Sequence, residues 1–214
     1  MLIACWSTKG GVGTSVVAAA LALLLGHTAG RGVVLADLAG DGPAVLGLPE
    51  PASSGLAGWL AAGNRVPADA LARIEVEVAP RLALLPRGDG PLPAERAGVL
   101  AAVLDGATRT AVADCGRVDD PAAAAVVRRA SRSLLVTRSC FVALRRLRSA
   151  PVRPSGVVLV TEPGRVLSRA DVEAAADAPV VAQVALDPQV ARLVDSGLLA
   201  GRLPRSLHPL RAAA

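Results

Sequence analysis

The stretch LIACWSTKGGVGTS, residues 2–15, decides the fold class, because it places a glycine-rich loop between two apolar segments. Residues 2–6 are apolar and have the length of a buried strand, and residues 14–26 are alanine-rich and have the length of a buried helix. Glycines between them allow the backbone to turn its N–H groups inward, toward an anion at the helix N-terminus. The stretch therefore predicts a phosphate-binding loop between a strand and a helix.

Apolar strands and helices alternate along the rest of the chain. The sequence predicts further strands at residues 33–37, 81–86, 110–114, 133–137, 156–161 and 180–185, and further helices at 94–105, 122–130, 142–148, 169–176 and 188–196. This alternation is typical of βαβ units, and unbroken apolar strands indicate a sheet covered on both faces. We expect an α/β fold, a doubly wound and mainly parallel sheet that binds ligands at the carboxyl ends of its strands.

Length and composition limit the organisation of the chain. The 214 residues, 52% of them apolar, suffice for a single domain over residues 1–214, and no stretch resembles a linker. Pro204 and Pro209 interrupt any helix in the tail, residues 202–214, so we expect this tail to be poorly ordered. A membrane-binding amphipathic helix is not expected there for the same reason.

Composition also argues against several classes of protein. Only 1% of the residues are aromatic, which argues against a base-stacking platform for single-stranded nucleic acid. The three cysteines are isolated in the sequence, and no Cys or His pair has the spacing of zinc ligands. A chain of this length without a disulfide framework fits a reducing compartment, so we expect a cytoplasmic protein.

The loop resembles the deviant Walker A motif of the ParA/MinD family, P-loop ATPases of the SIMIBI class, which reads Lys-Gly-Gly-Val-Gly-Lys-Thr/Ser. The matching positions are Lys9, Gly10, Gly11, Val12, Gly13, Thr14 and Ser15. The resemblance implies that Lys9 reaches across a dimer interface to the partner's nucleotide and that Ser15 ligates magnesium. Thr14 departs from the motif, since it stands where the family has its phosphate-binding lysine. This ending is similar to the CpaE/TadZ branch, which is associated with assembly and polar placement of Tad-type pili.

Lys9 is the only lysine in the chain, beside 22 arginines. A chain that carries nearly all its positive charge on arginine has a reason to keep one lysine. A compact ammonium group on a flexible stem enters a tight phosphate loop more easily than a guanidinium fork does. The composition thus supports a role for Lys9 at the phosphates.

Two strands that end in aspartate resemble the other motifs of the family. Residues 33–37 end at Asp37 and resemble an apolar strand followed by Asp-x-Asp, in which the second aspartate is needed for hydrolysis. Ala39 stands at that second position. Asp41, two residues beyond it, is the nearby acidic residue that could substitute, although the shift changes its direction and reach. Residues 110–114 end at Asp114 and resemble Walker B, whose aspartate lies beside the metal. The resemblance implies a magnesium site made by Ser15, Asp37 and Asp114.

The later strands extend the resemblance to about residue 200. Residues 156–161 resemble the strand that in relatives ends at an asparagine that contacts adenine, and Thr161 stands there in this chain. The implied cofactor is ATP or ADP with Mg²⁺, held by the loop residues together with Asp37, Asp114 and Thr161.

The departures at Thr14, Ala39 and Thr161 predict weak or absent ATP hydrolysis, because charge in the transition state lacks its partners. No residue is assigned a catalytic role, and Lys9 is expected to contact phosphate across a dimer. We expect a nucleotide-binding homodimer that acts as a scaffold or positioning factor for a protein partner in pilus or secretion assembly.

The alternative is a ParA-like partition ATPase that binds non-specific DNA, for which the net charge of +5 and a cluster of arginines speak. The arginines of the cluster are Arg128, Arg129, Arg132, Arg145, Arg146 and Arg148.

Overall fold

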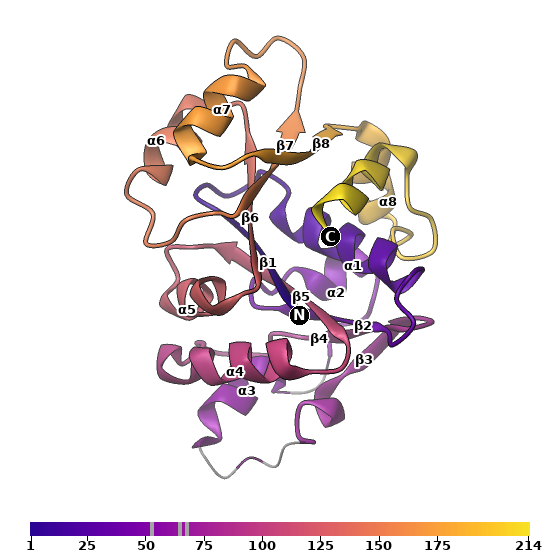
Figure 1. The fold of residues 1–214 in the computed structure, drawn as a ribbon. Helices are drawn as coiled ribbons and strands as arrows, with labels where there is room; N and C mark the ends of the chain where they lie inside the picture. Colours follow the sequence, from indigo (N-terminus) through magenta and orange to yellow (C-terminus); the bar gives the residue numbers. More distant parts are fainter. Residues whose placement is uncertain (52–53, 64–65, 67–68) are drawn as a thin grey trace.

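A single eight-stranded sheet runs through the computed structural model, which describes residues 1–51, 54–63, 66 and 69–214 (Figure 1). The strand order is β3-β4-β2-β5-β1-β6-β7-β8. The strands are β1 (Leu2–Ser7), β2 (Val33–Asp37), β3 (Val76–Ala79), β4 (Leu82–Leu85), β5 (Thr110–Arg117), β6 (Arg132–Arg138), β7 (Gly156–Thr161) and β8 (Val180–Ala185). Every neighbouring pair is parallel except β3 with β4. The predicted doubly wound, mainly parallel sheet is confirmed.

Helices cover both faces of this sheet, as Figure 1 shows. They are α1 (Thr14–Gly26), α2 (Gly42–Leu46), α3 (Gly55–Ala61), α4 (Ala94–Gly106), α5 (Pro121–Arg129), α6 (Phe141–Leu147), α7 (Arg169–Ala176) and α8 (Pro188–Asp195), with the 3₁₀ helices η2 (Ala72–Ile74) and η3 (Arg205–Ala213). Side chains of α1, α2, α8 and η3 form the core on one face, and those of α3 to α7 form the core on the other. No described helix has both the length and the apolarity needed to cross a bilayer.

Strand β1 explains why its sequence is apolar at every position. Leu2, Ala4 and Trp6 belong to one core, whereas Ile3 and Cys5 belong to the other. Side chains alternate between the two faces of a strand, so a central strand with helices on both sides has no exposed position. The chain leaves β1 at the carboxyl edge of the sheet and enters α1, which fixes the place of the glycine-rich loop.

The sequence pattern does not predict β3, α2, α3 or the 3₁₀ helices. Strand β3 is a half-buried edge strand of four residues, and its Glu77 breaks the apolar run. Helices α2 and α3 contain glycine or proline and have five and seven residues, too few for a helical period to show. Burial of Leu56, Trp59 and Leu60 in the core stabilises α3 where local propensity does not.

The C-terminal tail is folded, in contrast to the poor order that its prolines suggest. Helix η3 packs against β8 and α1 and buries Leu207, Leu210 and Ala213. The Arg132 guanidinium donates a hydrogen bond to the carbonyl of Ala214. Prolines exclude a long α-helix, but a 3₁₀ helix accommodates Pro209 and still presents two leucines to the core.

One backbone contact joins α2 to α8. Helix α2 ends at Gly47, which has φ +71°, and a Cβ atom at this position would lie 2.1 Å from the carbonyl oxygen of Gly197. Gly197 follows the end of α8 and has φ +68°. Only glycine allows the two backbones to approach this closely.

Candidate functional site: the phosphate loop and its carboxylates

The phosphate loop, residues 9–15, connects β1 to the N-terminus of α1. Gly11 and Gly13 have φ +73° and +94°, and no atom lies within 4 Å of a Cβ built at either position. Glycine is therefore required there by the backbone conformation and not by crowding. Gly13 is the N-cap of α1, and no side chain caps the helix. The first N–H groups of α1 are thus available to a bound anion.

Lys9 and Thr14 differ in their surroundings. Lys9 is partly exposed, while Thr14, the first residue of α1, is 8% exposed. The hydroxyl of Thr8 donates a 2.9 Å hydrogen bond to the Ala143 carbonyl, which fixes the loop to α6. Lys9 lies near enough to the start of α6 to contribute to a lowered pKa of Cys140, after the N–H groups of Ala143 and Val142.

Asp37 ends β2 and is completely buried. Its two carboxylate oxygens accept hydrogen bonds from the N–H groups of Gly40, at 2.7 Å, and Gly42, at 2.8 Å. Burial raises the pKa of this carboxyl, and the two N–H groups oppose the rise. The carboxylate therefore holds residues 37–42, the Asp37 loop, in a turn through hydrogen bonds to two of its own N–H groups.

Asp114 is the register partner of Asp37 on the neighbouring strand β5. It is 2% exposed, and its Oδ1 accepts a 3.0 Å hydrogen bond from the Gly116 N–H. Its Oδ2 is shielded from solvent and has no hydrogen-bond partner in the described part of the chain. Burial raises the pKa of Asp114 to about 7, opposed by the Ser15 hydroxyl and increased by the Asp37 charge. An unpaired buried carboxylate oxygen is costly unless a ligand or ion meets it.

Asp41 approaches the phosphate loop from the end of the Asp37 loop. Its Oδ2 lies 3.4 Å from the Oγ of Ser15, which donates to it. Asp41 is also the N-cap residue of α2, yet its side chain accepts no capping hydrogen bond. Ala39, two residues earlier, places its Cβ 3.1 Å from where a Cβ on Gly116 would lie. The loop thus brings Asp41 to Ser15 and leaves a methyl group against β5.

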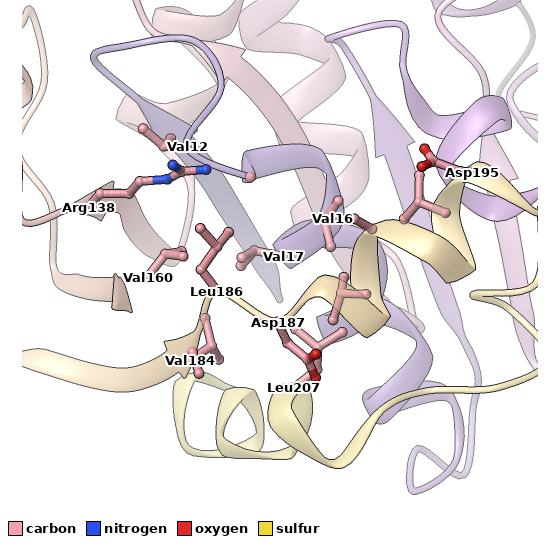
Figure 2. A pocket seen from close by; sticks show the side chains of 15 residues that line it. Val12, Val16, Val17, Arg138, Val160, Val184, Leu186, Asp187, Asp195 and Leu207 are labelled. Atoms are coloured by element: carbon pink, nitrogen blue, oxygen red, sulfur yellow. The ribbon is translucent and has the colours of Figure 1, made fainter. Parts of the chain in front are cut away.

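A pocket of about 290 Å³ lies beside the phosphate loop (Figure 2). Its lining is mainly apolar and includes Val12, Val17, Val160, Val184 and Leu186. Arg138 extends from the end of β6 toward Val12, as Figure 2 shows, and forms a 2.9 Å ion pair with Glu162. An apolar slot with a guanidinium group at its rim suits a flat heteroaromatic ring.

Thr161 does not line this pocket. Its hydroxyl donates a 3.3 Å hydrogen bond to the carbonyl of Val184, within the β7–β8 pair. Arg138 does line the pocket, although the sequence analysis did not select it. Its position directly after the predicted strand 133–137 is the signal that points to it, since ligands lie at the carboxyl ends of the strands.

Comparisons with known proteins give no match by sequence: no family model and no curated protein matches the chain. Solved structures do match. The ParA family ATPase from Chlorobium tepidum TLS has a TM-score of 0.80 and 19% identity, over 99% of this chain and 96% of that chain. MinD from Pyrococcus horikoshii OT3, complexed with Mg-ADP, has a TM-score of 0.79 and 19% identity, over 99% and 93%. The chain has the ParA/MinD fold.

A third ParA/MinD structure agrees equally well. The MinC:MinD cell division protein complex from Aquifex aeolicus matches with a TM-score of 0.78 and 22% identity, over 99% of this chain and 93% of that chain. These matches span the chain from end to end, so the tail and the edge strand belong to the common architecture.

The ParA/MinD fold brings most of the predicted site residues to one edge of the sheet. The phosphate loop follows β1, Asp37 ends β2, and Asp114 lies on β5 between them. Thr161 ends β7 at the same edge of the sheet, with β6 between β7 and β1, and its hydroxyl donates to the Val184 carbonyl. Asp41 joins the group, although the resemblance assigned no role to it.

The donor set fits magnesium better than a metal that needs a cage of protein ligands. Among the described residues no three His, Cys, Asp or Glu side chains form a group that could hold a metal ion. Magnesium usually takes one or two carboxylates and fills its other positions with water and substrate phosphates. Ser15, Asp41 and the unpaired Oδ2 of Asp114 match this requirement.

Proposed function

We propose that the chain binds ATP or ADP with Mg²⁺, hydrolyses it little or not at all, and acts as a homodimeric scaffold or positioning factor in pilus or secretion assembly, similar to CpaE and TadZ. The observation that carries the nucleotide part is the unpaired, buried Oδ2 of Asp114 beside an uncapped helix N-terminus. A phosphate-bound cation and an anion would satisfy both features together.

The chain's own residues divide the binding between them. N–H groups of the phosphate loop and of the first turn of α1 donate to phosphate oxygens. Lys9 adds the positive charge that the loop otherwise lacks, and Ser15 presents its hydroxyl to the cation side. When bound, Mg²⁺ neutralises phosphate charge. The pocket beside Val12 and Arg138 receives the base.

Weak hydrolysis follows from two missing groups. Thr14 brings no charge to the phosphates, and losing an ionic partner at a desolvated site costs about 2–5 kcal/mol. Ala39 places a methyl group where the family resemblance implies a carboxylate. The Ala39 methyl group cannot orient an attacking water as an acidic side chain at this position would.

The Asp37 loop is also already held in place. Asp37 binds two of its N–H groups, the Leu38 N–H donates to the Asp114 carbonyl, and the Arg87 guanidinium donates to the Leu38 carbonyl. A loop with this many contacts gains little further order from a γ-phosphate. This supports a binding protein over a nucleotide-driven switch.

An exposed aromatic residue supports the role in assembly. Phe141, the only phenylalanine of the chain, is 68% exposed at the start of α6, and Val142 beside it is 45% exposed. Large exposed apolar side chains that lie together are more common at protein interfaces than elsewhere on a surface. Lys9 lies near the same helix end, so the phosphate loop and this surface are neighbours.

The DNA-binding alternative has weaker support. Arg132 donates to the Ala214 carbonyl, and Arg129 lies against Gly98 of α4, so these two arginines have other contacts. The other four arginines of the cluster are exposed: Arg128 in α5, Arg145 and Arg146 in α6, and Arg148 at the end of α6. A gel shift on non-specific duplex DNA at two salt concentrations tests this alternative, because phosphate contacts weaken steeply with salt.

A thermal-shift titration with ATP and Mg²⁺ tests the proposal, with Lys9→Ala and the charge-conserving Lys9→Arg for comparison. At a hundredfold excess of ligand over its dissociation constant, binding stabilises the native state by about 2.7 kcal/mol. We expect ATP and Mg²⁺ to stabilise the wild type by this amount. The stabilisation should be clearly smaller in Lys9→Ala and partly reduced in Lys9→Arg. Absence of stabilisation by either nucleotide would overturn nucleotide binding. Metal-dependent turnover above about 1 per minute, against ~10 per second for ordinary enzymes, would overturn the hydrolysis deficiency.

A further inference from the structure

We infer that Asp41 supplies the loop carboxylate of the divalent-cation site, together with Ser15 and Asp114, in place of Asp37, whose carboxylate is bound by its own loop. This inference rests on the proposed nucleotide binding. It assigns the cation to a residue that neither the motif resemblance nor the comparisons select.

Asp37, the residue that the resemblance selects, is occupied by the loop itself. Both of its oxygens accept backbone hydrogen bonds, and the side chain has no exposed surface. A Cβ on Gly42 would lie 2.7 Å from its Oδ2, so the chain passes directly over this carboxylate. Binding a cation at Asp37 would require that the loop give up the two bonds that close it.

Asp41, by contrast, has a carboxylate that local structure does not use. An aspartate at the N-cap of a helix ordinarily accepts a hydrogen bond from the N–H of the second or third helical residue. Asp41 occupies the N-cap position of α2 without accepting one, so helix capping does not account for its orientation. Its Oδ2 accepts instead from the Ser15 hydroxyl, 3.4 Å away across the mouth of the phosphate loop.

Asp114 provides an independent observation at the same place. It is 2% exposed, and its Oδ2 makes no hydrogen bond in the described part of the chain, although Ser15 and Asp41 lie near it. Ser15 thus lies between a partly used carboxylate from β5 and an exposed one from the Asp37 loop. The three side chains come from three separate elements, α1, the Asp37 loop and β5, at the same edge of the sheet.

The charges of this arrangement call for a cation. Asp37 and Asp114 are register partners on neighbouring strands, and Asp41 lies beside Ser15, so three carboxyl groups gather at the mouth of the phosphate loop. A divalent ion between Ser15, Asp41 and Asp114 would offset the negative charge gathered there, with water and phosphate oxygens as its remaining ligands. The glycine turn at Gly40, which has φ +99°, is what carries Asp41 back to Ser15 after Ala39 has turned away.

Binding of Mn²⁺ to the ADP-saturated protein, followed by the electron paramagnetic resonance signal of free Mn²⁺, tests the inference. Asp41→Asn removes the charge and keeps the shape. Glu50 and Asp41 both line a second pocket, next to the Asp37 loop, so Glu50→Gln removes the same charge nearby and serves as the matched control. We expect Asp41→Asn to weaken Mn²⁺ binding by about 10-fold or more, in the range found for residues that support a metal site, and Glu50→Gln by less than about twofold.

ADP affinity measured in EDTA separates the possible failures. Without metal, Asp41→Asn should bind ADP as well as the wild type or better, because a negative charge near the phosphates is gone. ADP binding with equal Mn²⁺ affinity in the wild type and Asp41→Asn would overturn the inference alone. Absence of ADP binding to the wild type would overturn the proposed function and this inference with it. Asp41→Glu, which should recover part of the Mn²⁺ affinity, shows that any loss comes from the carboxylate.

Discussion

Asp37, the last residue of β2, and Asp114 on β5 are register partners, and of the two only Asp37 has hydrogen-bond partners for both carboxylate oxygens in the described part of the chain. The difference follows from what comes next in the chain. After Asp37, a loop with glycine at positions 40 and 42 folds back and donates two N–H groups. After Asp114, the strand continues to Arg117, and one N–H group, that of Gly116, reaches the carboxylate.

Replacing Asp114 should stabilise the metal-free protein at high pH. The folded-state pKa is about 7 against 3.8 for the free group, so the folded state holds a proton that the unfolded state has lost between these values. Stability therefore falls as pH rises through this window, by up to about 1.4 kcal/mol per pH unit from this group. Above pH 7 the full destabilisation is present, and Asp114→Asn removes it.

Urea unfolding of both proteins in EDTA at pH 5, 6, 7 and 8 checks this. We expect the two stability curves to diverge as pH rises, with the variant the more stable at pH 8. Asp89→Asn, at an exposed position, should leave the slope of the wild type unchanged. Parallel curves for wild type and Asp114→Asn would contradict the assignment.

Restoring the loop lysine should tighten ATP binding. Thr14→Lys places an ammonium group at the first position of α1, and we expect affinity to rise by at least about 10-fold, equivalent to 1.4 kcal/mol. Thr14→Met, of similar length without charge, is the control. Isothermal titration calorimetry with ATP and Mg²⁺ measures both, and equal affinities for the two variants would show that charge at this position does not limit binding.

The double variant Thr14→Lys with Ala39→Asp should gain phosphate release that neither single change gives. It supplies both groups whose absence predicts weak hydrolysis, one at the phosphates and one in the Asp37 loop. A phosphate-release assay over several hours detects slow turnover. If the double variant is as inactive as the wild type, some other feature of the site prevents hydrolysis.

Cys140 should be the one rapidly reacting thiol of the native protein. Burial raises the pKa of Cys5 and Cys115, whereas the N–H groups of Ala143 and Val142, with Lys9 and Arg165, lower that of Cys140. The thiolate is the reactive form. Ellman's reagent at pH 7 should show one fast equivalent that Cys140→Ser removes, with all three thiols reacting in denaturant. Any fast-reacting thiol that remains in Cys140→Ser would contradict the burial of Cys5 and Cys115.

The tail should contribute to global stability. Leu210 of η3 is completely buried, and Leu210→Ala should cost about 2–5 kcal/mol, as do other leucine deletions in cores. Leu198→Ala, at a side chain that is 56% exposed, should change stability by less than about 0.5 kcal/mol. Denaturant unfolding compares them. A Leu210→Ala protein as stable as the wild type would show that η3 does not pack as described.

The sequence predicts the central elements well because their signals are local and strong. The predicted helix at residues 14–26 and the strands at 33–37, 156–161 and 180–185 have the bounds that the structure shows. Each consists mainly of apolar residues, and a glycine, serine or proline directly precedes it. Elements that depend on tertiary burial, such as η3 and α3, leave no such pattern, so they were missed.

The site was predictable in outline and not in detail. A glycine-rich loop between strand and helix predicts a phosphate site, and a buried strand that ends in aspartate marks the cation side. Which of Asp37 and Asp41 turns toward Ser15 depends on the positive φ of Gly40, which sequence alone does not give. The sequence does not mark Arg138 as a pocket residue. Arg138 lies near Val12 because β6 is next to β1 in the sheet, and the sequence does not give this strand order.

The close approach of Gly47 to Gly197 ties the two sides of the ligand site together. The Asp37 loop leads through α2 to Gly47, and α8, which lines the pocket beside Arg138, leads to Gly197. A base bound against α8 would contact the helix whose end meets the end of α2. Asp41 is the N-cap residue of α2. Binding of the base and affinity for the cation would then be coupled through the backbone contact between Gly47 and Gly197.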